Sequence, residues 1–355
     1  MGKSRVIGLD IGTTAVRAAQ LDFGSGGPSS SNQPTLVRYG EVPIPIGAVR
    51  DGEVTDQLVV SNAIRELWAK VKFESKDVVI GVGNQRVVVR ELSVPAMPLP
   101  QIRTSLPFQV QEMLPMATDE ALLDFFPTSE GAGESGPVVN GLLVAAVRDT
   151  VSANVLAVES AGLRPTMVDL NGFALLRGMI RGENVGRTIA LVDIGARVTD
   201  VVVVAQGLPR FVRTLPLGGQ DATDGIARSM NVSGTEAESL KRQIGIGFSV
   251  PADLADAAEA LSDVCRHLIE AIRNTFVYFA SNNPSASIDL VIMTGGGAHL
   301  PGLGQYLSSA SRLPVTLGNP LEAVQVARTA GGREAFAGHE SLMALSMGLA
   351  YGVAA

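Results

Sequence analysis

The sequence predicts an α/β protein of two related domains, with a binding cleft between them and a small α/β subdomain inserted into the first. Three observations predict this fold class. A strand–turn–strand segment that begins at Val6 is repeated in similar form from Leu191. A buried strand later delivers three glycines, Gly295 to Gly297, to the start of a helix. Between these segments, apolar runs of strand length alternate with stretches of helical periodicity, which is typical of a mixed α/β protein.

The bulk composition supports a folded protein and excludes several function classes. The chain has 355 residues, of which 46% are hydrophobic and 18% charged, which is enough apolar material for a core of about two domains. A net charge of −7 and an aromatic content of 5% argue against nucleic-acid binding. The single cysteine, Cys265, excludes an intramolecular disulfide and is expected to be buried. The three histidines, His267, His299 and His339, lie too far apart in the sequence to predict a metal site.

No segment has the pattern of a membrane span or a signal peptide. The chain contains no run of about 18 apolar residues, and its N-terminus leads directly into a strand rather than into an apolar h-region. We therefore expect a cytoplasmic protein without direct membrane insertion.

The first domain is expected over residues 1–185. Its polar, Gly/Ser-rich stretch Gly24–Pro34 predicts a long hairpin tip. The expected strands are Arg5–Asp10, Ala15–Leu21, Thr35–Val42, Val78–Val82 and Thr166–Leu170, and the expected helices are Thr55–Val71 and Gly172–Arg181.

A new pattern starts near Arg86 and predicts the inserted subdomain, at about residues 84–164. A second polar stretch, Thr128–Pro137, predicts another loop tip. The expected strands are Val87–Val94, Ala121–Phe126 and Val139–Val147, and the expected helices are Pro100–Met113, interrupted near Pro107, and Val151–Ala161, which ends at Gly162.

The second domain is expected over residues 186–355. Its strands are expected at Ile189–Ile194, Val198–Ala205, Leu208–Leu215 and Leu290–Thr294, and its helices at Asp221–Met230, Gly234–Gln243, Ala252–Ala280, from Leu303, and over the last segment Ser341–Ala355.

The two repeated segments have the pattern of phosphate-binding hairpins. Each places Asp-Ile-Gly and a tight turn between two strands. Glycine lets the backbone approach an anion closely, and the turn amides can then point at phosphate oxygens. Asp10 and Asp193 would repel phosphate, so we expect both to act through Mg²⁺ and its waters. One such hairpin is weak evidence, whereas two copies half a chain apart predict a site for Mg·ATP. The residues expected to hold the nucleotide here are Gly12, Thr13, Thr14, Arg17, Gly195, Ala196 and Arg197.

Two further segments are expected to complete the nucleotide site. Gly295, Gly296 and Gly297 would let a flat ring and a ribose lie against the main chain, and the turn that follows, with His299, leads to a helix N-terminus. Glu238 and Lys241 are three residues apart on one helix face and could bracket a ribose or an adenine edge. Taken alone, the Glu–Lys pair also fits a solvated ion pair.

In this order, the four segments resemble the superfamily of actin, sugar kinases and heat-shock chaperones, which has a ribonuclease H-like fold. The resemblance covers nearly the whole chain. Within the superfamily, the chain most resembles the PilM family, the cytoplasmic actin-like proteins of type IV pilus assembly, which are relatives of the division protein FtsA. The stretches that carry the closer resemblance are Arg90–Pro98, Gln109–Pro115, Leu143–Val147, Ala161–Pro165 and Val168–Leu175.

The resemblance implies an ATP-binding scaffold of a pilus or related type II secretion assembly, in which nucleotide sets the domain angle and so controls partner binding. It also implies that the partner is PilN, a single-span membrane protein that would bind through its short N-terminal cytoplasmic peptide. The resemblance leaves open whether the chain also self-associates. This chain has Asn171 where the family often has an acidic residue, and a neutral amide can orient a water but is a poor general base. Arg17 stands where relatives often have lysine, and either cation can hold a phosphate. We therefore expect a slow ATPase at most.

The inserted subdomain is expected to present the peptide groove, between itself and the first domain. Apolar residues on its helix and flanking strand are the candidates to line it, although each could instead belong to the subdomain core. These are Val94, Met97, Phe108 and Met113.

Two other functions stay open. An FtsA-like polymer that tethers division proteins to the membrane would want a basic amphipathic C-terminal helix, and residues 342–355 contain no Lys or Arg. A sugar or small-molecule kinase would need an aspartate base, for which Asp169 is the candidate.

Overall fold

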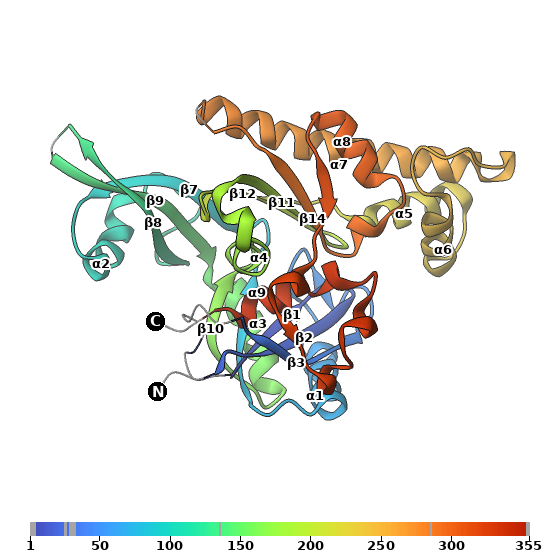
Figure 1. Cartoon of the computed structure of the whole chain (residues 1–355), viewed down its shortest axis with the longest axis horizontal. Coiled ribbons are helices and arrows are strands. Elements are labelled where there is room, and N and C mark those ends of the chain that lie inside the picture. The colour runs from blue at the N-terminus through green and yellow to red at the C-terminus, as the bar shows by residue number, and fades with distance from the viewer. Residues whose placement is uncertain (1–4, 25–26, 28–32, 135, 285, 353–355) are drawn as a thin grey trace.

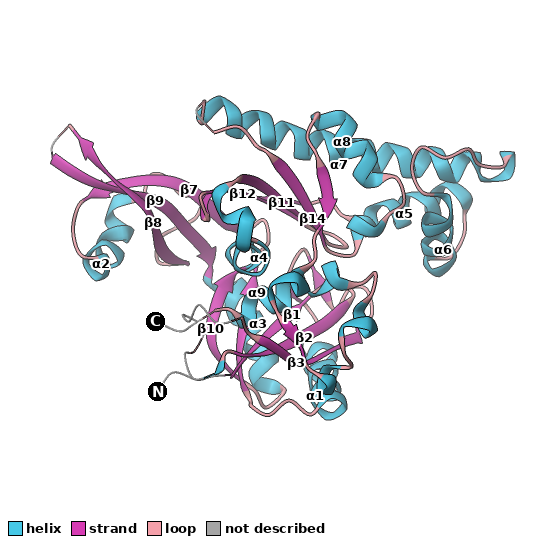
Figure 2. Ribbon diagram, in the orientation of Figure 1, coloured by secondary structure: helices cyan, strands magenta, loops and turns pink. Residues whose placement is uncertain are grey.

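The chain folds into two domains, each built on a mixed β-sheet, and a smaller sheet that projects to one side. The computed structural model describes residues 5–24, 27, 33–134, 136–284 and 286–352. Figure 1 shows the first domain below, the second above, and the third sheet to the left. Helices flank both large sheets (Figure 2).

The first domain contains a six-stranded sheet with the strand order β10-β6-β1-β2-β3-β16. Strands β1, β2 and β3 form an antiparallel meander, whereas β6, β10 and β16 pair with their neighbours in parallel. The strands are β1 (Arg5–Ile11), β2 (Ala15–Asp22), β3 (Thr35–Pro43), β6 (Asp77–Val82), β10 (Arg164–Leu170) and β16 (Gln325–Val326), and a separate two-stranded ribbon joins β4 (Val49–Arg50) to β5 (Glu53–Val54).

Helices cover both faces of this sheet. On one face, α1 (Gln57–Val71) and α3 (Arg148–Ser160) contribute Ile64, Leu67 and Val158 to a core with Ile7 and Leu9 of β1. On the other face lie α4 (Asn171–Met179) and α9 (Ala344–Ala350). The sheet is therefore apolar on both sides, which explains its nearly continuous hydrophobic strands.

The second domain has a five-stranded sheet with the order β13-β12-β11-β14-β15. One face packs on α5 and the long helix α7, and the other packs on α4. The elements are β11 (Thr188–Ile194), β12 (Thr199–Ala205), β13 (Leu208–Leu215), α5 (Gly219–Met230), α6 (Gly234–Ile244), α7 (Ala255–Asn282), β14 (Leu290–Thr294), α8 (Leu303–Ser311) and β15 (Val315–Leu317).

The predicted repeat is confirmed by the topology. In each domain a three-stranded antiparallel meander is followed by a helical segment, which is α1 in the first domain and α5 to α7 in the second, and then by a strand that pairs in parallel with the first strand: β6 with β1, and β14 with β11. This shared layout places the turns after β1 and β11 at corresponding positions of the two sheets. The strand ranges expected from periodicity agree with the observed ones to within a few residues in both meanders.

The inserted sheet has three antiparallel strands in the order β7-β9-β8, with one helix packed on it. These elements are β7 (Val87–Pro95), α2 (Leu99–Gln109), β8 (Ala121–Gly133) and β9 (Gly136–Val147). Its core contains Ile102 and Leu106 of α2 with Phe125 of β8. The β8–β9 hairpin extends away from both domains (Figure 1).

Two segments pack elsewhere than the sequence suggests. Helix α3, placed in the insert by its expected bounds of 84–164, belongs to the first-domain core. Residues 319–352, expected in the second domain, return to the first: β16 pairs with β3, and Met347 of α9 packs against Leu21 of β2. We therefore propose an insert of about 87–147 and a first domain that includes the C-terminal segment.

Helices α4 and α9 cross where the two domains meet, in the centre of Figure 1. A Cβ added at Gly348 of α9 would overlap the Ala174 carbonyl oxygen of α4, and one at Gly8 of β1 would overlap the Ser346 carbonyl oxygen. Glycine at these positions therefore lets the backbones of three elements approach closely.

Other expectations are corrected by the structure. The helix expected over Pro100–Met113 ends at Gln109, two residues after Pro107, because proline removes a donor and crowds the preceding turn. The polar stretch Thr128–Pro137 is mostly strand, since cross-strand pairing continues to Gly133 and Gly136. In the described part of the last segment, which ends at residue 352, the α-helix covers only α9, after a 3-10 turn at Glu340–Met343. Most of Gly24–Pro34 lies outside the described residues.

Candidate functional site

A cleft of about 870 Å³ lies between the two domains. Both Asp-Ile-Gly turns, the glycine turn after β14, and the N-terminal ends of α4 and α5 contribute to its walls. The structure therefore brings together segments that are almost 300 residues apart in the sequence. Of the residues predicted to hold nucleotide and cation, the cleft is lined by Asp10, Gly12, Thr13, Thr14, Arg17, Asn171, Asp193, Gly195, Ala196, Glu238, Lys241, Gly295, Gly296, Gly297 and His299.

The two hairpin turns have the same local structure. Gly12 N–H donates to the Ala15 carbonyl at 3.1 Å, and Gly195 N–H donates to the Val198 carbonyl at 2.9 Å. A Cβ at Gly12 would lie 3.0 Å from the Ala15 carbonyl oxygen, and a Cβ at Gly195 would lie 2.8 Å from the Val198 carbonyl oxygen. These are the oxygens that accept the hydrogen bonds closing the two turns. Glycine is therefore required by the tightness of the turn, which leaves the following residues at the surface of the cleft.

Strand pairing brings a third aspartate into the site. In the first hairpin Asp10 is paired with Arg17, and at the corresponding position of the second hairpin Asp193 is paired with Asp200. Asp200 is 6% exposed and lines the cleft. Asp200 was not among the site residues predicted from the sequence, although aligning the two hairpins by their Asp-Ile-Gly motifs places it at the position equivalent to Arg17.

Burial perturbs these carboxyl groups. It raises the pKa of Asp10 to about 6, an effect that Arg17 opposes and Asp193 reinforces. Burial also raises the pKa of Asp193, and a 2.7 Å hydrogen bond donated by Thr294 opposes this rise. For Asp200, burial raises the pKa to about 7; a 2.6 Å hydrogen bond from Thr214 opposes this, and the charge of Asp193 adds to it. The cleft thus concentrates negative charge that a bound cation would stabilise.

Two arginines predicted to hold phosphate have different surroundings. Arg17 lines the cleft and donates from Nε to Glu41 at 2.9 Å. Arg197 is not among the described residues that line the cleft, because its guanidinium is held by Asp221 and Asp224 of α5. The structure therefore gives Arg197 a different role from the one expected: it fastens the second hairpin turn to α5.

The surroundings of an added Cβ differ among the three glycines of the triplet. Gly295 has a φ of +81°, and its added Cβ would lie 2.5 Å from the Ile194 carbonyl oxygen. A Cβ at Gly297 would overlap the Ile194 side chain. Only at Gly296 is the space open, with Leu342 Cδ2 as the nearest atom at 3.7 Å. Gly295 and Gly297 therefore pack the turn against β11, and Gly296 alone leaves room for a ligand.

Glu238 and Lys241 belong to the cleft rather than to a solvated surface. Lys241 Nζ donates to the Gly219 carbonyl at 3.0 Å and to Thr223 Oγ1 at 2.9 Å, and it lies 2.6 Å from Glu238 Oε2. Arg242 contacts the other Glu238 oxygen at 2.8 Å. This network fixes α6 against the N-terminal end of α5.

Asn171 stands at the first position of α4 and lines the cleft. Its side chain packs closely on the backbone of Gly83, where an added Cβ would lie 2.6 Å from Asn171 Nδ2. The buried Oδ1 atom of Asn171 has no hydrogen-bond partner among the described residues. A buried amide oxygen without a partner suits a ligand or a bound water.

Asp169 does not face the cleft. It is 6% exposed and forms an ion pair with Arg177 of α4, and it is absent from the described residues that line the cleft. Asp169 is therefore not placed to act as the base of a small-molecule kinase in this cleft. Cys265 is buried, as expected.

Among the described residues, no group of three or more His, Cys, Asp or Glu side chains is arranged to hold a metal ion. Within the same residues, no helix is long and apolar enough to cross a bilayer.

The four expected partner-binding residues occupy different environments in the insert. Val94 is fully buried in the core with Ile102, so it cannot line a groove as it stands. Met113 is partly buried against that core. Phe108 is 85% exposed on α2. Met97 lines a hollow of about 350 Å³.

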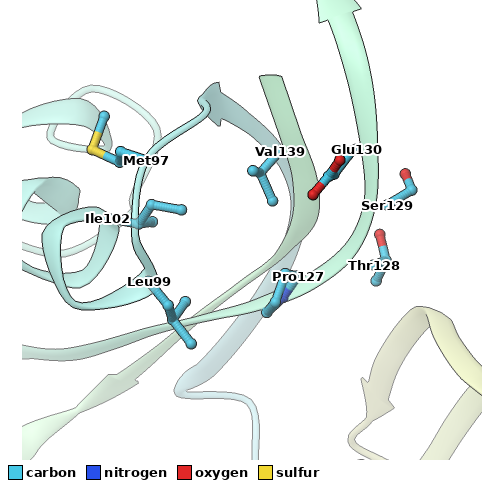
Figure 3. A pocket seen from close by; sticks show the side chains of 8 residues that line it. All are labelled: Met97, Leu99, Ile102, Pro127, Thr128, Ser129, Glu130 and Val139. Carbon is cyan, nitrogen blue, oxygen red and sulfur yellow. The ribbon is translucent and has the colours of Figure 1, made fainter. Parts of the chain in front are cut away.

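This hollow lies within the insert, between the start of α2 and the β8–β9 hairpin. Figure 3 shows Leu99 and Ile102 on one side and Val139 and Pro127 on the other. Thr128, Ser129 and Glu130 form its polar rim on β8. A shallow apolar floor beside an exposed strand suits one anchor residue of an extended peptide.

Comparisons with known proteins agree with this architecture. A family model described as type IV pilus assembly protein PilM matches residues 8–352. A chain of the solved PilM–PilN type IV pilus biogenesis complex is 28% identical, with a TM-score of 0.83 and coverage of 97% of each chain. MreB5 of Spiroplasma citri, solved with AMPPNP, has a TM-score of 0.54 at 14% identity, with 98% of this chain and 95% of that one covered. This last match is of the fold alone, and it confirms the actin-like fold.

Among curated proteins, the chain is similar to the cell division protein FtsA. The Bacillus subtilis protein is 29% identical over 110 residues, which span 31% of this chain but only 25% of that protein. The Pseudomonas aeruginosa protein is 22% identical over 354 residues, covering 89% of this chain and 83% of that protein.

The match over residues 8–352 covers nearly the whole chain, including the insert and the C-terminal segment that returns to the first domain. The chain therefore belongs to the family of the type IV pilus assembly protein PilM.

Proposed function

We propose that this protein is a scaffold of type IV pilus assembly that binds Mg·ATP in the interdomain cleft and a PilN-like peptide on its insert. The observation that carries the proposal is the pair of Asp-Ile-Gly turns that line one cleft from opposite domains. A ligand with several phosphates can bind both turns at once and so hold the domains at one angle. The structural match to a chain from a PilM–PilN complex supports the partner.

The residues of the cleft fit the nucleotide. The turns at Gly12 and Gly195 leave Thr13, Thr14 and Ala196 to face phosphate oxygens, with Arg17 as a further cation. Gly296 has open space for a ring, and the unpartnered Asn171 Oδ1 can accept a hydrogen bond from a water. When bound, Mg²⁺ would offset the charge of the phosphates and of the acidic side chains.

Cation binding would rest on Asp10 and Asp193, which act through waters and the phosphate oxygens of the nucleotide rather than as part of a preformed set of three protein ligands; Asp200 would add its charge. The charge of Asp193 interacts with Asp10 of the other domain and with Asp200 on the neighbouring strand. Carboxylates with water and phosphate oxygens are the ligand set that Mg²⁺ prefers. Because each proton must leave before a cation is stabilised, binding should strengthen as pH rises through 6 to 7.

Hydrolysis is expected to be slow. Asn171 can orient a water but cannot take its proton, and the only carboxylate in the connecting segment, Asp169, is paired with Arg177. Nucleotide would then act mainly as a structural ligand that sets the domain angle. We expect the protein to lie at the cytoplasmic face of the membrane through its partner.

A path from the cleft to the insert runs through α4. Asn171 at the start of α4 lines the cleft, and Phe173 two residues later packs on Phe126 of β8, with ring centroids 5.0 Å apart. Val87 and Val89 of β7 also pack against the second-domain core. A change in domain angle would therefore move the base of the insert.

The partner peptide is proposed to use the hollow at Met97 as an anchor pocket, with Phe108 and Met113 on the neighbouring surface. A direct experiment titrates the N-terminal cytoplasmic peptide of the PilN-like protein against the full chain, with and without Mg·ATP. The proposal expects binding that Mg·ATP changes at least several-fold. Met97→Asp should weaken binding strongly, whereas Leu58→Asp, at an exposed position on α1, should not. Equal affinity of both variants and the wild type would rule out the hollow.

A further inference from the structure

Two of the three histidines of the chain meet at the cleft. His299 lies in the turn after β14, and His339 lies just before the 3-10 turn that leads to α9. Their ring centroids are 6.3 Å apart, and both residues line the cleft. His299 is carried by the second domain, whereas His339 is carried by the segment that returns to the first domain. The pair therefore brings side chains carried by the two domains close together in the cleft lining.

The wall beside these imidazoles differs from the wall at the hairpins. At the hairpins, the cleft presents carboxylates, Arg17 and tight turns. At the glycine turn, it presents the open face of Gly296 with Leu342 nearby, and Leu300 also lines the wall. A surface of glycine, leucine and imidazole suits a planar, uncharged aromatic ring rather than a phosphate.

The two rings offer different contacts. His299 Nε2 is 2.7 Å from Ser341 Oγ, which holds the ring in place. Burial lowers the pKa of His299, an effect to which the charges of His339 and Arg242 add and which Glu340 opposes. His299 is therefore neutral near pH 7, with one donor and one acceptor. His339 is exposed and lines the cleft, and within the described residues no hydrogen bond to its ring is found.

We propose that His339 stacks on the base of the bound nucleotide and that His299 faces the edge of the base, so that base binding ties the C-terminal segment to the glycine turn. The inference rests on the proposed nucleotide binding and deepens it, because it makes His339 a residue that distinguishes a nucleotide from other polyphosphates. A purine gives the larger stacking area and is the expected ligand class.

The test compares Mg·ATP with magnesium tripolyphosphate, which carries the phosphates without base or ribose. Affinities are measured by calorimetry for the wild type, His339→Ala, His339→Phe and the control His267→Ala, whose histidine is exposed on α7 outside the cleft lining. Loss of one base–aromatic stack predicts roughly tenfold weaker ATP binding for His339→Ala. His339→Phe should retain ATP affinity, and His267→Ala should match the wild type. Tripolyphosphate affinity should be the same in all four proteins.

Two results would overturn the inference: His339→Ala binding ATP as tightly as the wild type, or losing ATP and tripolyphosphate affinity equally. Circular dichroism of each variant verifies that the fold is intact. Failure of the wild type to bind ATP at all would instead overturn the proposed function, so the two failures are distinguishable.

Discussion

We predict that Asp200 makes the apo protein sensitive to pH, and its replacement by asparagine tests this directly. Burial raises the pKa of Asp200 from its ordinary 3.8 to about 7. A carboxyl group with a raised pKa in the folded state stabilises the protein below its unfolded pKa, and this stability is lost as pH rises through the folded value. The difference between 3.8 and about 7 corresponds to on the order of 4 kcal/mol, lost mostly between pH 4 and pH 7.

Asp200→Asn removes the charge and keeps an acceptor for the Thr214 hydroxyl, which donates at 2.6 Å. Thermal unfolding is followed by circular dichroism in EDTA at pH 5 and pH 8. We expect the variant to gain stability relative to the wild type as pH rises, by roughly 3 kcal/mol across this interval, which is several degrees in Tm. Added Mg²⁺ should raise the Tm of the wild type more than that of the variant.

Asp22→Asn is the matched control. The pKa of Asp22 is lowered, because hydrogen bonds from Gly24 N–H and Arg5 outweigh the effect of burial. Asp22 is thus ionised in the folded and the unfolded protein across pH 5 to 8, and its variant should change Tm equally at both values. A Tm difference for Asp200→Asn that is the same at pH 5 and pH 8, or a larger loss at pH 8, would refute the reasoning.

Three further predictions follow from other contacts. Gly348→Val should destabilise the protein by several kcal/mol, because its Cβ overlaps the Ala174 carbonyl where α9 crosses α4; a normal Tm would contradict this close approach. Asn171→Asp should speed phosphate release by roughly tenfold or more, because the new carboxylate supplies the general base that position 171 lacks. An unchanged rate would show that Asn171 does not limit hydrolysis. Phe173→Ala should leave Mg·ATP affinity intact while abolishing the effect of nucleotide on peptide binding, since it removes the ring packed on Phe126; persistence of that effect would exclude this path.

Sequence patterns predicted the parts of the site that depend on local structure. The two Asp-Ile-Gly turns were identifiable because a tight turn after a buried strand has a short, repeated signature. Asp200 was missed because its importance arises from the pairing of β11 with β12, which puts two aspartates side by side. The spacing of Glu238 and Lys241 predicted an ion pair, but not that Thr223 and Gly219 would hold it against the cleft.

Long-range packing was the main limit of sequence analysis for the fold. The return of the C-terminal segment depends on the two residues of β16 pairing with β3 and on the packing of α9 against β1 and β2. A two-residue strand carries no periodicity, so nothing local predicts this pairing. For the same reason α3 was assigned to the insert that precedes it, although its apolar face completes the core beneath β1 and β6.

Nucleotide binding is the central claim, and calorimetric titration of the wild type and Gly296→Glu with Mg·ATP tests it most directly. Gly296 has ordinary helical backbone angles, φ −68° and ψ −33°, and an open Cβ direction, so glutamate fits the backbone and projects into the cleft. Gly186→Glu, at an exposed position with no atom near its Cβ, is the control. We expect saturable Mg·ATP binding by the wild type and Gly186→Glu and none by Gly296→Glu. Absence of wild-type binding at millimolar nucleotide, or equal binding by all three proteins, would contradict it.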